Sequence, residues 1–585
     1  MPKFDLSKTP IPRPEHPRPE FFRKDWKNLN GLWQFEKDVA ASGFARKFEE
    51  REDFEQEIIV PFVPETELSG INYQDFMKAV WYRKKLDIPA DWKKSGRVLL
   101  HFEAVDYKTT VWVNKKKAGE HLGGYTPFVL DITALLEDGD NYVVVGAYDD
   151  TPNNMQPSGK QCNEYFNYGC MYTRCTGIWQ TVWMEHVTDT YITNFKLTPD
   201  VDNEKLYVEA NLNQYSGGKA FTATASFEGK EVAKVTAKAT GKTAKLVLDI
   251  TNPILWGPGA PNLYDITLEI DGDVVESYFG MRKVEIDGYA IKINGKPVYQ
   301  RLVLDQAYYP DGIYTAQSDE ELKRDIVLAM DAGFNGARMH MKIFEPRYIY
   351  HADKLGYLVW GEYPNWGLNE TDERALVHML PEWMEELRRD YNHPSIVGWC
   401  PFNETNRDRV AATFEAVYDA TRLYDEQRPI IDTSGYVHSK KTDIYDVHDY
   451  DQNLDTFAER YQKLEDATDN LDDIYMNCPE REREVFKFDI PYFVSEFGGP
   501  WWSIDADTSG WGYGESPKEI EEVYRRYEGW VTALLKNKKM CAFCYTQITD
   551  VQQEVNGVYT FDRRVKLDVS RLKKINEQKA AIEEE

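Results

Sequence analysis

The first third of the chain alternates apolar and polar residues in short runs that turn residues separate. Residues 97–103, 109–114, 142–146 and 179–184 each show this alternation, whose period of two is typical of strands with one buried face. Short strands at close spacing favour a β-sandwich. The pattern therefore predicts a first β-sandwich domain over residues 1–187.

A second all-β stretch follows over residues 188–287. Residues 205–212 and 264–270 alternate in the same way. A stretch of about 100 residues with such strands suits an immunoglobulin-like β-sandwich. We therefore expect this stretch to form a second domain.

Beyond residue 288 short apolar runs alternate with helical periodicity. Ser318 and Glu321 have the spacing of a capping box, and Leu322, Ile326 and Met330 follow on one helix face. The apolar runs predict strands near residues 297–303, 334–340, 357–362, 395–403, 429–432, 443–448, 491–496 and 540–546. Repeated strand and helix units of this kind predict a (β/α)8 TIM barrel over residues 288–585, with the functional groups at the carboxyl ends of the strands.

The composition fits a folded protein and limits its partners. Hydrophobic residues make up 42% of the 585 residues, and the formal net charge is −28. Such a charge repels nucleic-acid phosphates and anionic membrane surfaces, and no apolar run reaches the roughly 18 residues of a membrane helix. We expect no nucleic acid and no membrane among the partners.

The cysteines and the N-terminus indicate the compartment. Seven cysteines form an odd, sparse set, and the N-terminus lacks the apolar core of an export signal. We therefore expect free thiols and a cytoplasmic location. Cys541 and Cys544 have a spacing that also occurs in zinc sites, but they lie on a predicted strand without a second pair, so no metal site is predicted.

Two of the predicted barrel strands are apolar along their length and finish in a glutamate. Glu404 follows the fourth strand and Glu496 ends the seventh, so their carboxylates should face one another across the barrel mouth. Two facing carboxylates can hydrolyse a glycosidic bond, because one donates a proton to the leaving oxygen while the other attacks or activates water. Either glutamate alone could instead be a salt-bridged residue at the barrel end.

The residues around these glutamates resemble a known family. The runs His393-Pro-Ser-Ile, Asn403-Glu404 and Ser495-Glu496-Phe-Gly are similar to the acid/base and nucleophile motifs of glycoside hydrolase family 2, the β-galactosidase and β-glucuronidase family. Further similar runs lie at residues 29–33, 174–180, 334–340 and 353–362. The resemblance implies a jelly-roll sugar-binding domain at the N-terminus, followed by the immunoglobulin-like domain and the catalytic barrel.

The same resemblance implies roles for the matching residues. Glu404 would be the acid/base, Glu496 the nucleophile, and Asn403 a donor to the sugar 2-hydroxyl. The family is retaining, which implies carboxyl groups roughly 5 to 5.5 Å apart.

Several neighbouring side chains can reach the same mouth. Arg338 and His340 point the same way from a strand of period two, and an arginine there lowers the pKa of the nucleophile, although His340 could also be a core histidine. Tyr450 resembles the family's tyrosine that hydrogen-bonds the nucleophile, although it could be purely structural. Trp366 and Trp501 follow barrel strands, where their rings can stack on a sugar or pack in the core.

The stretch after the eighth strand bears on the sugar. The family's glucuronidases carry an asparagine and a lysine there, and the lysine pairs with the sugar carboxylate; here Glu554 and Asn556 stand at these positions. A negative charge repels a uronate, so a neutral sugar is favoured, with Asn556 as a candidate contact. Met171 stands where the family has a first-domain aspartate, and Asp305 or Glu164 could replace that aspartate.

Three functions remain open on this sequence. The leading one is a retaining exo-β-glycosidase of neutral sugars, with β-galactosidase as the best single interpretation. The alternatives are a β-glucuronidase and a catalytically inactive carbohydrate-binding protein, which the presence of both glutamates disfavours. We expect a carbohydrate or glycoside as substrate and no cofactor, and a homo-oligomer is compatible with the sequence because multi-domain hydrolases often assemble.

Overall fold

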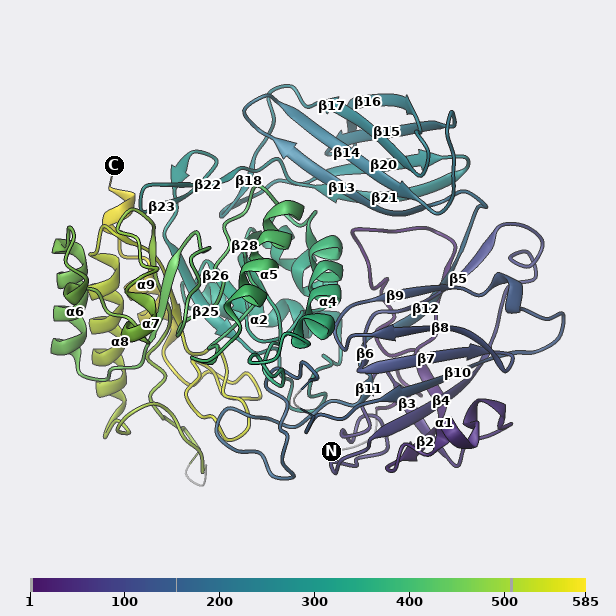
Figure 1. The fold of residues 1–585 in the computed structure, drawn as a ribbon, viewed down its shortest axis with the longest axis horizontal. Coiled ribbons are helices and arrows are strands. Elements are labelled where there is room, and N and C mark those ends of the chain that lie inside the picture. Colours follow the sequence, from purple (N-terminus) through teal and green to yellow (C-terminus); the bar gives the residue numbers. More distant parts are fainter. Residues whose placement is uncertain (1–3, 154, 506–508, 585) are drawn as a thin grey trace.

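The computed structural model describes residues 4–153, 155–505 and 509–584. The first β-sandwich and the barrel lie at opposite ends of the long axis in Figure 1, and the second β-sandwich lies above them. Among the described residues, no helix is both long and apolar enough to cross a membrane. The chain thus forms the two sandwiches and the barrel in the order that the sequence pattern predicts.

The first domain is a jelly-roll β-sandwich made of two antiparallel sheets. One sheet has the strand order β1-β12-β5-β9 and the other β3-β2-β4-β10-β7-β8. Their inward side chains form one apolar core that includes Trp33, Val111, Val145 and Met184. The elements of this domain are β1 (Trp26–Asn28), β2 (Gly31–Asp38), α1 (Gly43–Arg46), β3 (Gln56–Val60), β4 (Ala79–Leu86), β5 (Arg97–Phe102), β6 (Val105–Asp106), β7 (Lys108–Val113), β8 (Lys116–Leu122), β9 (Phe128–Asp131), β10 (Asn141–Tyr148), β11 (Gly177–Ile178) and β12 (Val182–Val187).

The second domain is an immunoglobulin-like sandwich of a three-stranded and a four-stranded sheet, with the orders β13-β14-β17 and β16-β15-β20-β21. Alternate residues of β14 and β20 are buried, so the period-two pattern of residues 205–212 and 264–270 places one face of each of these strands in the core. The strands are β13 (Ile192–Asp200), β14 (Lys205–Leu212), β15 (Ala220–Phe227), β16 (Lys230–Lys238), β17 (Thr243–Asp249), β18 (Trp256–Gly257), β19 (Ala260–Pro261), β20 (Tyr264–Ile270) and β21 (Asp273–Phe279).

A small three-stranded sheet connects this sandwich to the barrel. It consists of β22 (Val284–Asp287), β23 (Ala290–Ile293) and β24 (Lys296–Pro297). Its first hairpin turns at residues 288 and 289, where the sequence pattern changes from strands to alternating strands and helices.

Seven strands of the C-terminal region form one parallel sheet in the order β28-β27-β26-β25-β31-β30-β29. Residues 429–434 take the place of the remaining strand, because Ile430 and Ser434 make parallel bridges to the chain around β28, and the Ser434 hydroxyl and Gly435 N–H bond Asp446 of β29. The barrel strands are β25 (Gln300–Asp305), β26 (Gly336–Met339), β27 (Leu358–Glu362), β28 (Ile396–Cys400), β29 (Tyr445–Asp449), β30 (Tyr492–Phe497) and β31 (Met540–Tyr545).

The barrel helices follow their strands with the expected end signals. The helix α3 begins at Pro346, whose fixed φ suits the first helical turn, and stops at Gly356, whose φ is +70°. The predicted capping box does not form, because the Ser318 hydroxyl caps no amide and the Glu321 carboxylate accepts from the N–H of Gln317, at 2.8 Å, instead of that of Ser318. The helices are α2 (Asp319–Asp331), α3 (Pro346–Leu355), α4 (Ala375–Asp390), α5 (Ala411–Tyr424), α6 (Leu454–Asp466), α7 (Pro479–Glu482), α8 (Ile520–Leu535) and α9 (Val569–Asn576).

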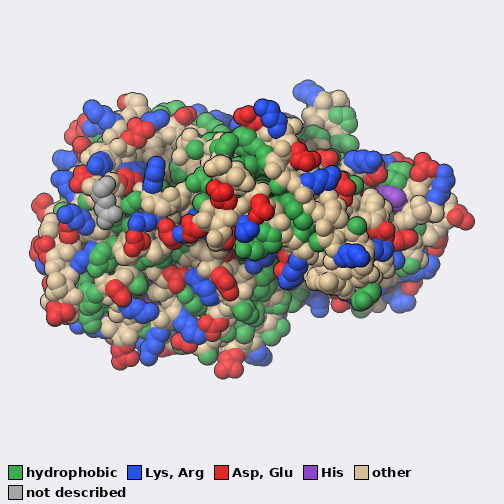
Figure 2. Space-filling model, turned by 90° about the horizontal axis from the view of Figure 1, so that it is seen from above, with side chains coloured by type: hydrophobic (Ala, Val, Ile, Leu, Met, Phe, Trp, Pro, Cys, Tyr) green, Lys and Arg blue, Asp and Glu red, His purple; other side chains and the backbone are tan. Residues whose placement is uncertain are grey.

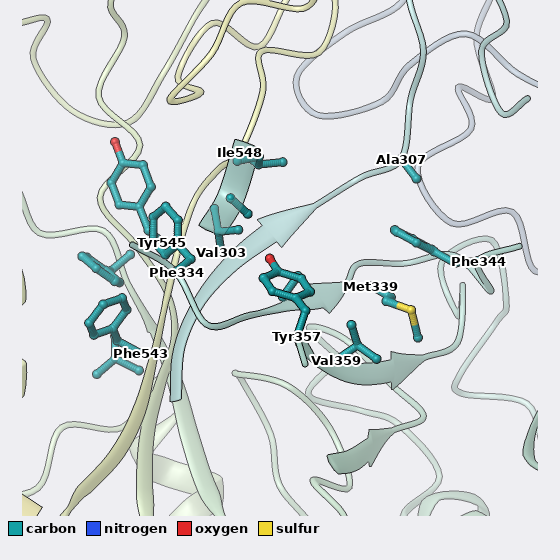
Figure 3. Close-up of a cluster of buried hydrophobic side chains, with 14 of the residues drawn as sticks. Val303, Ala307, Phe334, Met339, Phe344, Tyr357, Val359, Phe543, Tyr545 and Ile548 are labelled. Carbon is teal, nitrogen blue, oxygen red and sulfur yellow. The ribbon is translucent and has the colours of Figure 1, made fainter. Parts of the chain in front are cut away.

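Alternate side chains of the barrel strands pack on opposite faces of the sheet. Val303, Met339, Val359 and Phe543 belong to the large cluster that includes the helix side chains (Figure 3). Their neighbours Leu302, Leu304, Leu358 and Trp360 belong to a separate cluster that includes strand residues from across the barrel. The inward positions at the carboxyl ends are thereby left to polar residues, which form the candidate site.

The surface carries acidic and basic side chains interspersed over the face seen in Figure 2. All seven cysteines are free, as the sequence predicts. Six of them are buried, which fits small apolar packing residues better than a redox framework.

The first domain docks on the barrel through a buried carboxyl group. Glu382 of α4 accepts hydrogen bonds from the Tyr125 N–H of the first domain at 2.8 Å and from the Tyr363 hydroxyl at 2.9 Å. Burial raises the pKa of Glu382 from 4.5 to about 7. The folded protein therefore retains this proton between about pH 4.5 and 7, whereas the unfolded chain releases it.

We expect this carboxyl group to make the protein less stable as the pH rises. Its favourable contribution is complete below about pH 4.5 and is lost through about pH 7, at up to about 1.4 kcal/mol per pH unit. In Glu382→Gln this part of the decline should be absent. Melting temperatures of both proteins at pH 5 and pH 8, with the exposed Glu373→Gln as control, measure it; identical pH dependence of the Glu382→Gln variant and the wild type would contradict it.

Candidate active site

The structure brings Glu404 and Glu496 together at the mouth of the barrel. One atom each of Glu404, His448 and Glu496 lies within 4.8 Å of the others. Two carboxylates this close match the separation of roughly 5 to 5.5 Å at which one can attack an anomeric carbon while the other protonates the leaving group. Glu496 is buried and Glu404 is half-buried, so one of the two faces the opening.

Local backbone irregularities aim both carboxylates at the same point. The pairing of β29 with β30 shifts register, so that Val447 pairs with Val494 but His448 pairs with Glu496. This bulge turns the Glu496 side chain towards the mouth. Glu404 has φ +47°, a left-handed conformation that costs a non-glycine residue on the order of 1 kcal/mol, and its N–H is held by the Ser434 carbonyl at 2.9 Å.

Arg338 is the central cation of the site. Its guanidinium donates to Glu496 Oε1 at 3.1 Å, to the Asn403 side-chain oxygen at 3.1 Å, and to Glu362. Although burial raises the pKa of Glu496, the charges of His448 and Arg338 hold it below its ordinary value. The arginine therefore keeps Glu496 ionised, as a nucleophile requires.

His340 lies beside Arg338 on the same face of β26, as the period of two predicts. Its Nδ1 is 3.1 Å from Glu362 Oε2, and its Nε2 is 3.8 Å from Glu496 Oε1. The Nε2 atom is buried without a hydrogen-bond partner among the described residues. Because Glu362 fixes one ring nitrogen, the other remains able to bond a ligand in the pocket.

His448 bridges the two carboxylates, and sequence reasoning missed it. Its Nδ1 is 2.7 Å from Glu404 Oε1 and its Nε2 is 3.4 Å from Glu496 Oε1. Burial lowers the pKa of His448, but the Glu496 charge and the Glu404 hydrogen bond raise it above its ordinary value. Although burial raises the pKa of Glu404, the His448 contact lowers it. A proton at this site therefore belongs to the pair rather than to Glu404 alone.

Two stacked tyrosines form the side of the site next to Glu496. The Tyr450 hydroxyl donates to Glu496 Oε2 at 2.5 Å. The Tyr450 ring stacks on Tyr513, with centroids 3.4 Å apart and planes 7° apart. With Oε1 bound by Arg338 and Oε2 by Tyr450, the Glu496 carboxylate is held in one orientation.

Asn403 has a free donor in this pocket. Its backbone is held by the Asn365 side chain, at 2.9 Å and 3.1 Å, and by the Trp366 Nε1–H at 3.2 Å. Its side-chain nitrogen is buried without a partner among the described residues. An amide N–H held in this way is suited to donate to a substrate hydroxyl.

The first domain completes the site, which the sequence alone left open. The Gln552 side chain bonds Asn167 and Thr173, and the Gln553 side chain bonds the carbonyls of Gly169 and Met171. These contacts place residues 160–174 of the first domain against the loop after β31.

Lys160, Tyr172 and Glu554 meet at this contact. The Tyr172 hydroxyl and the Asn556 side-chain nitrogen both donate to the Glu554 carboxylate. The Lys160 ammonium lies 4.1 Å from the centre of the Trp366 ring. Lys160 was not found by sequence reasoning, because nothing in its loop indicates which surface it contacts.

The structure corrects two expected contacts. Asp305 lies two residues after Val303 on β25 and therefore on the side of the sheet that faces the helices. Its carboxylate accepts there from the Ala307 N–H at 2.8 Å and from the Tyr348 hydroxyl of α3 at 3.0 Å, so this aspartate does not face the site. The Glu164 side chain is exposed, and only its backbone carbonyl has a hydrogen bond among the described residues, which it accepts from the Arg174 guanidinium. Asn556 supports Glu554, and its side-chain oxygen is taken by Gln547 at 2.9 Å.

The two tryptophans have different surroundings. Trp366 is half-buried under Lys160 and contacts the residue before Glu404. Trp501 is half-buried, and its Nε1 is buried without a partner among the described residues. The ring of Trp366 is therefore tied to the site, whereas the contacts of Trp501 leave its role as a prediction.

The trio of Glu404, His448 and Glu496 has a spacing that would also suit a metal ion. Its hydrogen bonds account for the close approach without one, since a protonated imidazole stabilises two adjacent carboxylates. The absence of a metal stays a prediction.

Comparison with known proteins agrees with this architecture. Three models match in chain order: the sugar binding domain of glycosyl hydrolases family 2 over residues 26–182, glycosyl hydrolases family 2 over residues 190–282, and the TIM barrel domain of that family over residues 284–532. The chain belongs to glycosyl hydrolase family 2.

Proteins named beta-glucuronidase and proteins named beta-galactosidase both resemble this chain. A putative beta-glucuronidase of Formosa agariphila is 32% identical over 55% of this chain and 39% of its own length. A beta-galactosidase of Thermoanaerobacter pseudethanolicus is 26% identical over 65% of this chain and 52% of its own. The chain thus spans about half or less of these two relatives. The solved beta-glucuronidase of an uncultured Clostridium sp. has a TM-score of 0.78 at 21% identity, over 95% of this chain and 99% of that one, which shows a shared fold.

We expect His448→Gln to move the acidic limb of the pH profile of kcat/KM upward. Loss of the imidazolium removes a charge that holds the pKa of Glu496 down against burial, and such a neighbour shifts a carboxyl pKa by about one unit or more. Glycoside hydrolysis measured from pH 4 to 9 checks this, with His378→Gln, which bonds Tyr107 outside the site, as the matched control. An unmoved limb at full kcat would show that His448 has no such effect.

Proposed function

We propose that this family 2 protein is a retaining exo-β-glycosidase that removes a terminal sugar by double displacement. The observation that carries the proposal is the Glu404 and Glu496 pair, whose atoms approach within 4.8 Å around one histidine. At this separation there is no room for the water that an inverting mechanism places between a base and the anomeric carbon.

In the first step, Glu496 attacks the anomeric carbon and the bond to the leaving oxygen breaks. Arg338 and Tyr450 orient the two oxygens of Glu496. The proton that neutralises the leaving oxygen comes from Glu404, which draws on the pair that it forms with His448. The product of this step is a covalent glycosyl ester on Glu496 and a free alcohol.

In the second step, Glu404 takes a proton from water as that water attacks the anomeric carbon. The ester to Glu496 breaks, and the sugar leaves with its original anomeric configuration. Formation of the ester has removed the negative charge of Glu496, whose repulsion favours a protonated Glu404. The loss of this charge makes Glu404 a carboxylate at the stage when a base is needed.

We propose a neutral sugar, and a β-galactoside in particular, as the substrate. Glu362, Glu404, Glu496 and Glu554 supply four carboxylates to the site. The fixed cations are Arg338 and Lys160, and a protonated His448 adds a third. Burial raises the pKa of Glu554, although the Lys160 charge and the bonds from Tyr172 and Asn556 act against this. With Glu554 ionised, the pocket has a net negative charge, which disfavours a uronate.

A β-glucuronide is the second candidate. Lys160 supports it, because a buried ammonium is the kind of group that pairs with a sugar carboxylate. The names of several similar proteins, including one from Paenibacillus borealis that is 25% identical, are beta-glucuronidase. A comparison of glycosides of both kinds decides between the two candidates.

For the cellular setting, we propose a cytoplasmic enzyme, since seven unpaired cysteines suit a reducing compartment. The formation of a homo-oligomer stays a prediction.

The Glu496→Gln variant should lose hydrolysis while it keeps its fold. Glutamine cannot form the glycosyl ester, so kcat should fall by a factor of about 10⁴ or more, since nucleophilic catalysis is lost. The rates of wild type and variant on a panel of 4-nitrophenyl β-glycosides, with galactoside and glucuronide among them, measure both the activity and the preferred sugar. Full activity in the variant would refute the nucleophile assignment, and an inactive wild type would refute the function.

The rate loss caused by replacing the acid/base should depend on the leaving group. Glu404→Ala should slow an alkyl glycoside about 10²- to 10⁴-fold more than an activated dinitrophenyl glycoside, because only the poor leaving group needs the proton. The kcat/KM values for the two substrates in wild type and variant give this ratio. Equal losses on both would argue against Glu404 as the acid.

A further inference from the structure

Lys160 lies at the contact between the first domain and the barrel, in a turn that packing and hydrogen bonds fix. The turn that carries it is bound to the loop after β27, because the Ser158 N–H donates to the Trp366 carbonyl at 2.7 Å and the Gly159 N–H to the same oxygen at 3.1 Å. Gly159 has φ +55°, and a Cβ there would lie 2.4 Å from the Met341 carbonyl oxygen. Only glycine permits this approach, so the position of the next residue is fixed by packing.

The same fit is seen from the barrel side. Gly367 has φ +93°, and a Cβ on it would lie 2.4 Å from both the Gln156 carbonyl oxygen and the Ser158 hydroxyl. The Lys160 carbonyl in turn accepts from the Tyr172 N–H at 2.8 Å. The backbone of Lys160 is therefore held between the barrel and its own domain.

The side chain of Lys160 extends to the catalytic end of the barrel. Its ammonium is 4.1 Å from the centre of the Trp366 ring. The Trp366 Nε1–H donates to the Asn403 carbonyl at 3.2 Å, and Asn403 directly precedes Glu404. Trp366 therefore links the Lys160 ammonium to the residue that precedes the acid/base.

Lys160 is buried, with 7% of its surface exposed, yet it forms no ion pair with a described carboxylate within 4.0 Å. The Cys170 side chain interacts with this ammonium, but no described carboxylate neutralises it at close range, and a buried charge without such a counter-ion is costly. Although burial lowers the pKa of Lys160, the nearby Cys170, Glu404, Glu496 and Glu554 raise it. The ammonium therefore stays charged and retains donors for a ligand.

Glu554 offers complementary acceptors on the same wall. One of its oxygens accepts from the Tyr172 hydroxyl and the other from the Asn556 side chain at 2.9 Å. Each carboxylate oxygen has a second lone pair. A donor on Lys160 and an acceptor on Glu554 suit hydroxyl groups, which both donate and accept, better than a carboxylate, which Glu554 would repel.

We propose that Lys160 is a specificity-determining residue that the first domain supplies to the pocket, where its ammonium donates to a hydroxyl of a neutral terminal sugar while Glu554 accepts from another. This inference rests on the proposed glycosidase function. It assigns the choice of sugar to the contact between two domains, and the bond cleavage to the barrel alone.

The Lys160→Met variant tests the inference, since methionine has a similar length but no charge or donor. On 4-nitrophenyl β-D-galactopyranoside its kcat/KM should fall about 10- to 100-fold, the loss expected for one charge-assisted hydrogen bond. Lys160→Arg should recover part of the rate, because it keeps a charged donor. Lys117→Met, an exposed lysine on β8, is the matched control and should leave the rate unchanged.

A substrate cycle identifies the hydroxyl. Singly deoxygenated 4-nitrophenyl galactosides are compared with the parent galactoside. For one of them the kcat/KM of the wild type should be about 10- to 100-fold lower, and Lys160→Met should hydrolyse it at the same rate as the wild type, because the hydroxyl that Lys160 bonds is already missing. Melting temperatures of the variants exclude unfolding as the cause of a loss; if Lys160→Met does not fold, the same cycle is run with Lys160→Arg.

The outcomes separate the inference from the function on which it rests. A wild type that hydrolyses the galactoside, with Lys160→Met equally active, overturns the inference and leaves the function standing. A wild type that hydrolyses only 4-nitrophenyl β-D-glucuronide, with Lys160→Met defective on it, overturns the neutral-sugar assignment. A wild type inactive on every glycoside overturns the function itself.

Discussion

Four carboxylates lie close together at the mouth of the barrel, and the groups that contact them offset their mutual repulsion. Buried like charges repel strongly, and each acid here has at least one partner, some of which are shared. Arg338 lies between Glu362 and Glu496, His448 lies between Glu404 and Glu496, and Tyr172 and Asn556 hold Glu554. Removal of any one partner leaves a buried carboxylate without a counter-ion or a hydrogen-bond donor, which explains why side chains from so many elements meet at the site.

The sequence predicted the parts of this site that lie on regular strands. The positions of Arg338 and His340 follow from the period of two, and those of Glu404 and Glu496 from apolar strands that end in an acid. These inferences need only local geometry, because a parallel barrel brings the carboxyl ends of its strands to the same face.

The remainder depends on irregular backbone and on contacts between domains. The bulge in β30, the left-handed conformation of Glu404 and the bridging place of His448 have no local signature. Asp305 was expected at the mouth because it ends a strand, but its oxygens turn to Ala307 and Tyr348. Lys160 could be found only by knowing which surface the first domain presents to the barrel.

The glycine-lined contact between residues 156–160 and 364–368 has a consequence for how such a molecule can diversify. Because no side chain separates the two backbones there, a change in that short first-domain segment is transmitted directly to the substrate side of the barrel. The barrel residues that cleave the bond can then stay constant while the first domain, altered by a few residues or exchanged as a unit, changes which substrate the pocket accepts.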